Sequence, residues 1–484
     1  MIASAFARRA FALVAGLLIA GCATRPVNPP VTSIDEAGGY TLQSREAKRP
    51  RNNESDSLVV LTFSGGGTRA AAFAYGVLEV LRNTEFVGPK GNRGRLIDTI
   101  DVITGVSGGS FTALAYGLYG DKLFDEYEQR FLKRNVQGEI MSRTLNPFNW
   151  PTLWSDRWGR SELAANLYDE ILFGGATFAD LERGSGPLIM VMATDISTGA
   201  RLGFTQPAFD IICSDLKSVR LARAAAASSA VPLVLSPITL NNYGGTCGYK
   251  VPEWATAAAD PNNPARPAAR AMKRMEELAS YEDSKERPFL HLVDGGLADN
   301  LGMRSVLEAL EQMEAVRLRG GKTPFDRIKR IIVVVVNSLS VPATTWDKSE
   351  APPGNVEILI KATGVPIDRY SYETVELLRD IMARWDMMRR IRESEAFDAK
   401  KDPALASLIK APSAKLYAID VSFPQLKDKA EFAYLNDLPT SFVLPPEAVD
   451  HLRAAAGQIL MESPDFQALM KEIGAKIVTP PPAK

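Results

Sequence analysis

The stretch Leu58-Val59-Val60-Leu61-Thr62-Phe63-Ser64-Gly65-Gly66-Gly67-Thr68-Arg69 decides the fold of this chain. Residues 58–63 form a short, almost continuous apolar run, which is typical of a strand buried on both faces of a sheet. The glycines break this strand, and apolar residues at helical spacing follow over residues 68–82. A strand, a glycine turn and a helix in this order are the repeating unit of an α/β fold.

The same unit recurs further along the chain. The pattern predicts a strand at 100–104, a tight turn at 105–109 and a helix at 110–119. Further strands are expected at 188–193, 288–293, 330–337 and 415–421, and further helices at 268–278 and 368–393. This alternation predicts an α/β fold with a mainly parallel central sheet.

The N-terminus has the pattern of a secretory signal. Arg8 and Arg9 precede an apolar run at 10–20, which is too short for a comfortable transmembrane helix. The run ends in Leu18-Ile19-Ala20-Gly21-Cys22, which resembles the lipobox of bacterial lipoproteins, in which the cysteine is lipidated. An ordinary signal with a chance cysteine is the alternative. Ala23 is not the aspartate typical of inner-membrane retention, which favours the outer membrane.

These patterns divide the chain into four parts. We expect a signal peptide at 1–21, a flexible tether rich in proline and charge at 22–57, an α/β domain at 58–340, and a C-terminal extension packed on that domain at 341–484. Cys213 and Cys247 form a disulfide or remain two buried thiols, and the sequence leaves both possibilities open.

The overall charge favours no particular partner. Lys plus Arg number 56 against 57 Asp plus Glu, giving a net charge of −1. The chain therefore has no global basic field to recruit nucleic acid, and it has no nucleic-acid motif. No cluster has the spacing of metal ligands, so we expect no metal and no cofactor, although calcium held by carboxylates stays open.

Gly105-Val106-Ser107-Gly108-Gly109 fits the G-x-S-x-G pattern of a nucleophile elbow. Such a serine sits on a sharp strand-to-helix turn, where larger neighbours than Gly105 and Gly109 would clash with backbone. The following helix directs its N-terminal dipole at the serine and favours developing negative charge. The predicted strand before it and helix after it favour Ser107 as a nucleophile over a plain turn.

The glycine run at 64–69 joins a strand to a helix in the same way. It lacks the lysine of a Walker loop. Gly65, Gly67 and Ala70 fit the looser dinucleotide pattern, but that pattern also expects an acidic residue near the end of the next strand, and residues 82–95 are interpreted as a polar loop. What remains is a loop whose free N–H groups can bind an oxyanion, as acyl transfer requires.

Asp294-Gly295-Gly296 follows the strand predicted at 288–293, at the sheet edge where α/β sites form. The chain has only two histidines, His291 and His451. His291 should point to the opposite face of its strand from Asp294, and His451 lies among apolar helical neighbours. Both are interpreted as structural, so a carboxylate, best placed at Asp294, must serve as the base for Ser107.

The glycine run at 65–69, the serine motif at 105–109 and Asp294-Gly295-Gly296, in this order, resemble the patatin-like phospholipases. A segment at 224–232, ending in Ala230-Val231-Pro232, is similar to the block between nucleophile and aspartate in that family. The resemblance runs from about Leu58 to Leu310, and a weaker resemblance is found at Leu438-Pro439-Thr440-Ser441-Phe442.

The resemblance implies a patatin-like three-layer α/β sandwich with a mainly parallel sheet, helical inserts and a helical C-terminal region. It implies a Ser107–Asp294 dyad, an acyl-enzyme intermediate and a lipid or phospholipid substrate. The implied roles of the other motif residues are an oxyanion hole at Gly65, Gly66 and Gly67, loop structuring by Arg69, and support from Gly105, Gly109, Gly295 and Gly296. Ser64 and Ala70 depart from the family pattern, which puts the loop geometry in doubt more than the activity.

The leading hypothesis is therefore a lipid acyl hydrolase of the cell envelope, anchored through Cys22 to a membrane, most simply the outer membrane, facing the periplasm or the exterior. The alternatives are a short-ester hydrolase or acyltransferase on the same dyad, and a catalytically idle lipid-binding lipoprotein. Tryptophans at 150–158 suit either a lid or interfacial face or ordinary core packing. No protein partner is predicted.

Overall fold

A computed structural model describes residues 24–478 apart from 36–37, 49–55, 88–90, 92, 156–157, 252–268, 319–320, 343, 345 and 410–411. The signal-like segment and Cys22 lie outside the described residues, so their predicted roles stay predictions.

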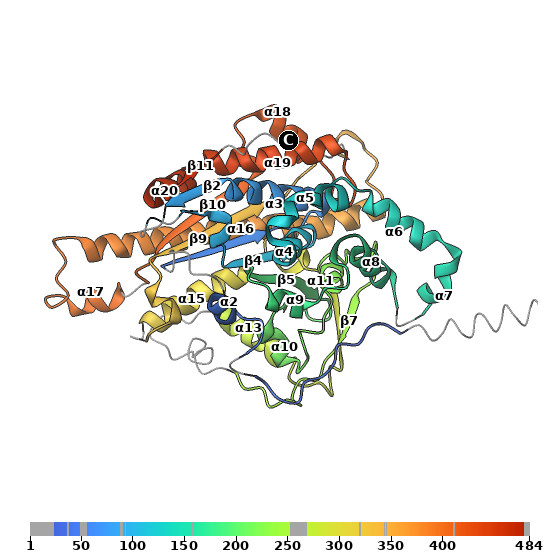
Figure 1. Ribbon diagram of the computed structural model, residues 1–484, viewed down its shortest axis with the longest axis horizontal. Coiled ribbons are helices and arrows are strands. Elements are labelled where there is room, and N and C mark those ends of the chain that lie inside the picture. Colours follow the sequence, from blue (N-terminus) through green and yellow to red (C-terminus); the bar gives the residue numbers. More distant parts are fainter. Residues whose placement is uncertain are drawn as a thin grey trace, which may run out of the picture.

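One central sheet organises the molecule (Figure 1). Its order is β10 (Lys415–Ser422), β9 (Arg330–Asn337), β1 (Ser57–Phe63), β4 (Val102–Val106), β5 (Leu188–Asp195), β8 (Phe289–Asp294) and β7 (Ile238–Asn241), with β6 (Ala200–Phe204) also paired to β5. The strands from β10 to β5 are parallel, whereas β6 and β8 run antiparallel to β5 and β7 antiparallel to β8. The predicted α/β fold with a mainly parallel sheet is confirmed.

The six predicted strands correspond to β1, β4, β5, β8, β9 and β10. They were recognisable because continuous apolar runs mark strands covered on both faces, and β9 is buried at every position but its two ends. Strands β6 and β7 were not predicted, nor were the short strands of a second sheet. That sheet has the order β11 (Lys476–Ile477), β2 (Thr84–Val87) and β3 (Arg93–Arg95). Strands this short carry little periodic signal.

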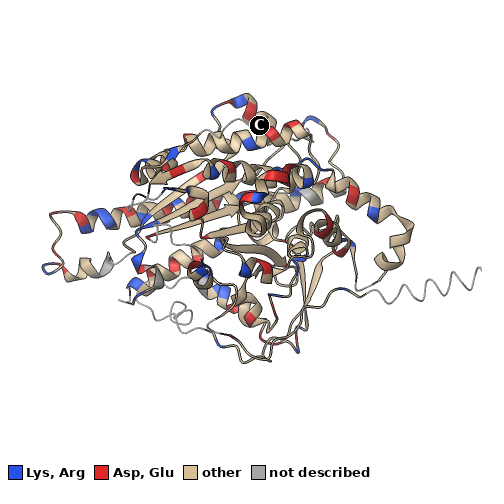
Figure 2. Ribbon diagram, in the orientation of Figure 1, with Lys and Arg blue, Asp and Glu red and all other residues tan. Residues whose placement is uncertain are grey.

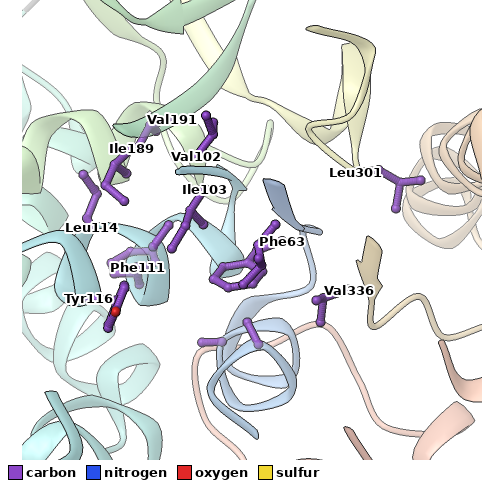
Figure 3. Packing of buried hydrophobic residues seen from close by; sticks show 14 of the residues in the cluster. Phe63, Val102, Ile103, Phe111, Leu114, Tyr116, Ile189, Val191, Leu301 and Val336 are labelled. Carbon is purple, nitrogen blue, oxygen red and sulfur yellow. The ribbon is translucent and has the colours of Figure 1, made fainter. Parts of the chain in front are cut away.

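Helices cover both faces of the central sheet. On one face lie α3 (Gly67–Arg82), α4 (Gly108–Tyr119) and α19 (Pro446–Glu462); on the other lie α14 (Gly296–Asp299), α15 (Arg304–Leu318) and α16 (Asn355–Glu393). Figure 3 shows Phe111 and Leu114 of α4 facing Ile103 of β4 in the core between the layers. This three-layer arrangement is the way an α/β protein buries both faces of a parallel sheet.

The remaining α-helices lie around these layers, and some of them also pack on strands of the central sheet. They are α2 (Leu42–Lys48), α5 (Leu123–Tyr127), α6 (Val136–Leu145), α7 (Trp150–Leu153), α8 (Arg160–Tyr168), α9 (Phe178–Arg183), α10 (Gln206–Ile211), α11 (Leu221–Ser228), α13 (Ala269–Ala279), α17 (Pro403–Leu408), α18 (Lys429–Asn436) and α20 (Pro464–Ile473).

Helix α16 is longer than predicted, because it begins at Asn355 and not at 368. The predicted start lay just beyond Pro366, since proline lacks the N–H of a helical hydrogen bond and usually ends a helix. Here Pro366 lies inside the helix, whose preceding turns are mostly exposed.

The flexible tether predicted at 22–57 is corrected by the structure where that segment is described. Tyr40 and Arg45 are both 1% exposed. The Tyr40 hydroxyl donates to Pro187 O and accepts from Ile189 N, at the start of β5, and Arg45 donates to three backbone carbonyls of the 182–186 turn. Proline and charge suggested a tether, but long-range hydrogen bonds that no local pattern reveals fix these residues to the body.

The C-terminal extension contributes to the central sheet itself. Its strand β10 pairs with β9 in register from Lys415↔Arg330 to Ser422↔Asn337. Helix α19 packs on α3, the helix that follows the glycine run. The sheet therefore spans the boundary at 340 that the sequence suggested.

Cys213 and Cys247 form a disulfide, with Cα atoms 5.5 Å apart. This decides the alternative that the sequence left open. Over the described part of the chain, no helix combines the length and apolar character needed to cross a membrane.

Candidate active site

Ser107 lies on the sharp turn between β4 and α4, as the serine motif predicts. Its backbone has φ 46° and ψ −120°, and only three non-glycine residues with positive φ occur among the described residues. A Cβ at Gly105 would lie 2.7 Å from Ser110 Cα, and one at Gly109 would lie 2.6 Å from Ser64 O. These close approaches are the physical reason for glycine on each side of the nucleophile.

Asp294 is the hydrogen-bond partner of Ser107. The Ser107 Oγ–H donates to Asp294 Oδ2 at 2.7 Å, and Gly296 N donates to Asp294 Oδ1 at 2.8 Å. Both side chains belong to buried residues, which are 4% and 8% exposed. The structure therefore brings together the two residues that the sequence proposed as a dyad, with each carboxylate oxygen held by one donor.

The strand that carries Asp294 runs in the opposite direction to the one that the sequence suggested. The sequence placed Asp294 at the edge where parallel strands end, but β8 is antiparallel to β5, so it runs inward from that edge. The dyad forms because the registers Val106↔Met192 and Ala193↔Asp294 bring the ends of β4 and β8 to the same level across β5. The predicted residue does lie beside Ser107, but the reasoning about strand direction was wrong.

Burial controls the charge of the dyad. Desolvation raises the pKa of Asp294 to about 6, against the lowering effect of its hydrogen bonds from Gly296 and Ser107. Above that pH the carboxylate is ionised and can accept the Ser107 proton. A carboxylate with a pKa near neutrality is a stronger base than an ordinary aspartate, which suits general-base catalysis.

Ser228 holds the backbone of the nucleophile, and the sequence analysis did not identify it. Its Oγ accepts a hydrogen bond from Ser107 N at 2.8 Å and donates to Met192 O at 2.6 Å. Ser228 and Ala230 also bind the segment that carries the other half of the dyad, because Ala230 O accepts from Asp294 N and Ser228 O accepts from Gly295 N. The segment at 224–232 was noted by resemblance alone, since an alanine- and serine-rich helix carries no chemical signal.

The glycine run lies beside the nucleophile. A Cβ on Gly65 would lie 3.2 Å from Ser107 Cβ, and one on Gly108 would lie 1.9 Å from Gly67 O. Gly65 N donates to Asn300 O at 3.0 Å, so this N–H is not available to an oxyanion, contrary to the sequence prediction for Gly65. For the N–H groups of Gly66 and Gly67, no acceptor is found among the described residues.

Asn300, a further residue that the sequence analysis missed, packs between the two glycine motifs. A Cβ on Gly65 would lie 2.4 Å, and one on Gly296 2.9 Å, from Asn300 Oδ1. A Cβ on Gly295 would lie 2.2 Å from Met192 O. Gly295 and Gly296 thus permit the close contact of the aspartate turn with β5 and with Asn300.

Arg69 structures the glycine loop, as the resemblance implies. It is buried, and its guanidinium donates to Ser338 O at 2.8 Å, Leu438 O at 2.6 Å and Thr440 Oγ1 at 3.1 Å. Burial lowers the pKa of Arg69 to about 10, which leaves the side chain charged at neutral pH. Next to it, Thr68 N donates to Ser441 O, so the 438–442 segment is built into the site.

Neither histidine is a partner of Ser107. His291 Nδ1 pairs with Thr239 Oγ1 at 3.0 Å, and His451 Nδ1 pairs with a Glu431 oxygen at 2.9 Å. In the described part of the chain, no group of three or more histidine, cysteine, aspartate or glutamate side chains could hold a metal ion.

The match to a protein-family model covers the three motifs. The model of the family described as patatin-like phospholipase matches residues 61–307, just over half of the chain. No curated protein matches.

Among solved structures, the chain is similar to human GIVD cytosolic phospholipase A2, with 13% identity and a TM-score of 0.40. The match covers 94% of this chain and 66% of that one. The same enzyme in complex with methyl γ-linolenyl fluorophosphonate gives 14% identity and a TM-score of 0.40, covering 90% of this chain and 62% of that one. On the extent of the family match, this chain belongs to the patatin-like phospholipase family, a family of lipid acyl hydrolases.

Proposed function

We propose that this protein hydrolyses carboxylic ester bonds of lipids, as a phospholipase A, lysophospholipase or related esterase, through a Ser107–Asp294 dyad. The observation that carries the proposal is the 2.7 Å hydrogen bond from Ser107 Oγ to Asp294 Oδ2, made by a serine on a strained turn. A serine held in this conformation, with a buried carboxylate as its acceptor, has the geometry of an activated nucleophile.

The reaction proceeds in two halves. Ser107 Oγ attacks the ester carbonyl carbon while its proton passes to Asp294 Oδ2. The tetrahedral intermediate collapses, the C–O bond to the alcohol breaks, and Asp294 returns the proton to that alcohol. Water then attacks the acyl-enzyme, Asp294 takes the proton of the water, and the released Ser107 oxygen recovers a proton as the carboxylic acid leaves.

Backbone N–H groups stabilise the negative charge on the carbonyl oxygen. Gly66 and Gly67 are the proposed donors, because Gly65 N is already bonded to Asn300 O. Gly67 begins α3, so the helix dipole adds to the field at the oxyanion.

We further propose that the protein is a lipid-anchored protein of the cell envelope, attached to its membrane through Cys22 and most simply placed in the outer membrane. The signal-like pattern at 1–21 supports this location. The disulfide between Cys213 and Cys247 supports an oxidising compartment.

The test uses the chain from Ala23 onward, which keeps every residue that the structure describes. Release of fatty acid from phospholipid vesicles and cleavage of a short-chain ester are measured for the unmodified chain, Ser107→Ala and Asp294→Asn. We expect both activities in the unmodified chain and losses of several orders of magnitude in both variants. A fluorophosphonate should label the unmodified chain and leave Ser107→Ala unlabelled.

Two other outcomes would change the assignment. Cleavage of the short ester alone would retain the dyad and replace the lipid substrate by a soluble ester or an acyl acceptor. Absence of both activities, with no labelling of Ser107, would leave a catalytically idle lipid-binding lipoprotein.

A further inference from the structure

An apolar arm projects from the body at the end of the molecule that holds the site. We define the arm as residues 136–155, which comprise α6, a 3₁₀ turn at Pro147–Asn149 and α7. Its large apolar side chains are exposed: Phe148 is 90% exposed and Trp154 65%, and Met141, Leu145 and Trp150 are also exposed. Apolar groups of this size in solvent have no role in the core and indicate a binding surface.

The tip of the arm carries no charge. Residues 144–155 include no Asp, Glu, Lys or Arg, and Figure 2 shows α7 free of charged positions. The two charged residues of α6 are paired, Glu139 with Arg134 just before the helix and Arg143 with Glu170 of the body. Trp150 and Trp154 lie together, with ring centroids 6.1 Å apart. Tryptophan, phenylalanine and leucine on an uncharged tip are the composition of a segment that enters a lipid interface.

A second exposed apolar segment lies between the arm and the dyad. Leu233 and Val234 are 61% and 65% exposed, and Leu233 has a φ of 72° although it is not glycine. Arg160, just after the arm, donates to Leu233 O at 3.0 Å. At the other end of this loop, Ala230 O accepts from Asp294 N. The loop at 231–234 therefore continues the apolar surface from the arm to the site.

The base of the arm is linked to the proposed oxyanion loop through residues 441–442. Gln137 N donates to Phe442 O at 3.2 Å, and Ser441 Oγ donates to Gln137 Oε1 at 2.9 Å. Ser441 O in turn accepts from Thr68 N, the residue after Gly67. A surface that binds the arm is thereby held in a fixed position relative to Gly66, Gly67 and Ser107.

The position of the arm in the molecule indicates what binds to it. In Figure 1, α7 and α17 lie at opposite ends of the molecule. Helix α17 precedes β10 and so lies at the amino-terminal edge of the parallel strands, which places α7 at the carboxyl edge, where Ser107 follows β4. The described chain begins at residue 24, two residues after Cys22. This end of the chain lies on the same side of the molecule as α7 (Figure 1).

We propose that the arm, together with the loop at 231–234, is a membrane-docking surface that inserts its aromatic side chains into a lipid interface and seats the active-site edge on it. This inference rests on the proposed function, because it takes the lipid surface that holds the substrate as the occupant. The uncharged tip enters the interface, while the paired charges of α6 stay at the level of the body.

Binding to vesicles tests the proposal separately from hydrolysis. The chain from Ala23 onward carries Ser107→Ala, so that binding does not depend on turnover. Vesicles of phosphatidylethanolamine and phosphatidylglycerol are the probe, and bound protein is measured by sedimentation. We expect Trp150→Ala/Trp154→Ala to weaken binding by at least about tenfold, because two interfacial anchors are removed. Brominated phospholipid should quench tryptophan fluorescence in the parent and much less in this variant.

The matched control is Tyr372→Ala/Met387→Ala, which removes two exposed apolar side chains from α16. It should bind vesicles as the parent does. With Ser107 restored, the arm variant should cleave the short ester within about twofold of the unmodified chain, showing that the site is intact.

Equal vesicle binding by the parent and the arm variant would overturn the proposal. The proposal would also be overturned if the parent did not bind vesicles but formed a dimer that the arm variant cannot form, because the arm would then bind a second copy of the chain. Loss of the proposed function gives a different result, because an inactive protein would still bind vesicles through the arm.

Discussion

Two residues of the site, Asp294 and Ser107, have features that lower the stability of the folded protein. Asp294 is buried, and desolvation raises its pKa from 3.8 to about 6 against the lowering effect of its hydrogen bonds from Gly296 and Ser107. Ser107 has a positive φ, which a non-glycine residue adopts only under constraint. Both features disfavour the folded state and both serve the proposed mechanism, as is common at active sites.

Asp294→Asn should therefore stabilise the protein above pH 6. The folded state binds the Asp294 proton more tightly than the unfolded state, so this group lowers the free energy of unfolding as pH rises from about 4 to 6. The variant lacks this loss and should be more stable at pH 8 by up to about 3 kcal/mol, with little difference at pH 4. Urea unfolding at the two pH values measures the effect.

Asp195→Asn is the matched control, because Asp195 is also buried but pairs with Arg287. Removing one member of a buried pair should destabilise the protein at pH 8. A loss of stability at pH 8 in both variants would contradict the account of Asp294.

Ser228→Ala should slow catalysis by releasing the backbone of the nucleophile. The change leaves Ser107 N without its acceptor, which costs about 1–3 kcal/mol and loosens the turn. We expect kcat to fall about 10- to 100-fold with KM little changed. The pH profile should keep its midpoint, because Asp294 is untouched.

Ser229→Ala is the control for this serine, since its hydroxyl donates to Ala225 O, within the α11 turn. Its kcat should stay near that of the parent. An equal fall of kcat in both variants would show that Ser228 has only a structural role.

At the scale of elements, the site is formed where the turns after β1, β4 and β8 pack backbone against backbone. Gly67 lies against Gly108, Gly109 against Ser64, and Gly295 against Met192. These contacts leave no room for a Cβ, so each motif needs its glycines because of a segment far away in the sequence.

Gly108→Ala should disrupt two elements at once. Its Cβ would lie 1.9 Å from Gly67 O, so α3 and α4 must separate at their N-termini. We expect a loss of about 1–3 kcal/mol in unfolding free energy and a fall in activity of more than about 100-fold. Thermal unfolding and ester hydrolysis measure the two effects.

Gly364→Ala on α16 provides the comparison, since nothing lies within 4 Å of its added Cβ. It should be neutral or stabilise the helix by about 0.5–1 kcal/mol. Normal activity in Gly108→Ala would show that the two glycine turns tolerate separation.

At the scale of the whole molecule, the family match and the folding unit differ in extent. The match covers 61–307, whereas the central sheet continues through β9 and β10 to residue 422. Helix α19 covers α3, and Leu438 and Thr440 bind Arg69. The C-terminal third therefore completes both the core and the loop at the site.

A chain ending at residue 340 should fail to fold. It would expose the β9 edge and the apolar face of α3 to solvent, which favours aggregation. A chain ending at residue 478 keeps every described residue and should stay soluble with full activity. Gel filtration and denaturant unfolding compare the two, and a monomeric, cooperatively unfolding 23–340 chain would refute this view of the core.

Sequence alone determined the strands with continuous apolar runs, the two glycine turns, and Ser107 and Asp294 as the candidate pair that the structure brings together. These features are local: a buried strand must be apolar along its length, and a sharp turn must contain small residues. With only two histidines in the chain, the choice of a carboxylate base was also a matter of composition.

Only the tertiary structure decided the direction of β8, the contacts of Ser228, the loss of Gly65 N to Asn300, the packing of Tyr40 and Arg45, and the disulfide. Each depends on contacts between segments far apart in the chain. A hydrogen bond over 121 residues, as between Ser107 and Ser228, leaves no periodic or compositional trace in either segment. Local patterns fix which residues can do the chemistry, and long-range packing fixes which groups remain free to do it.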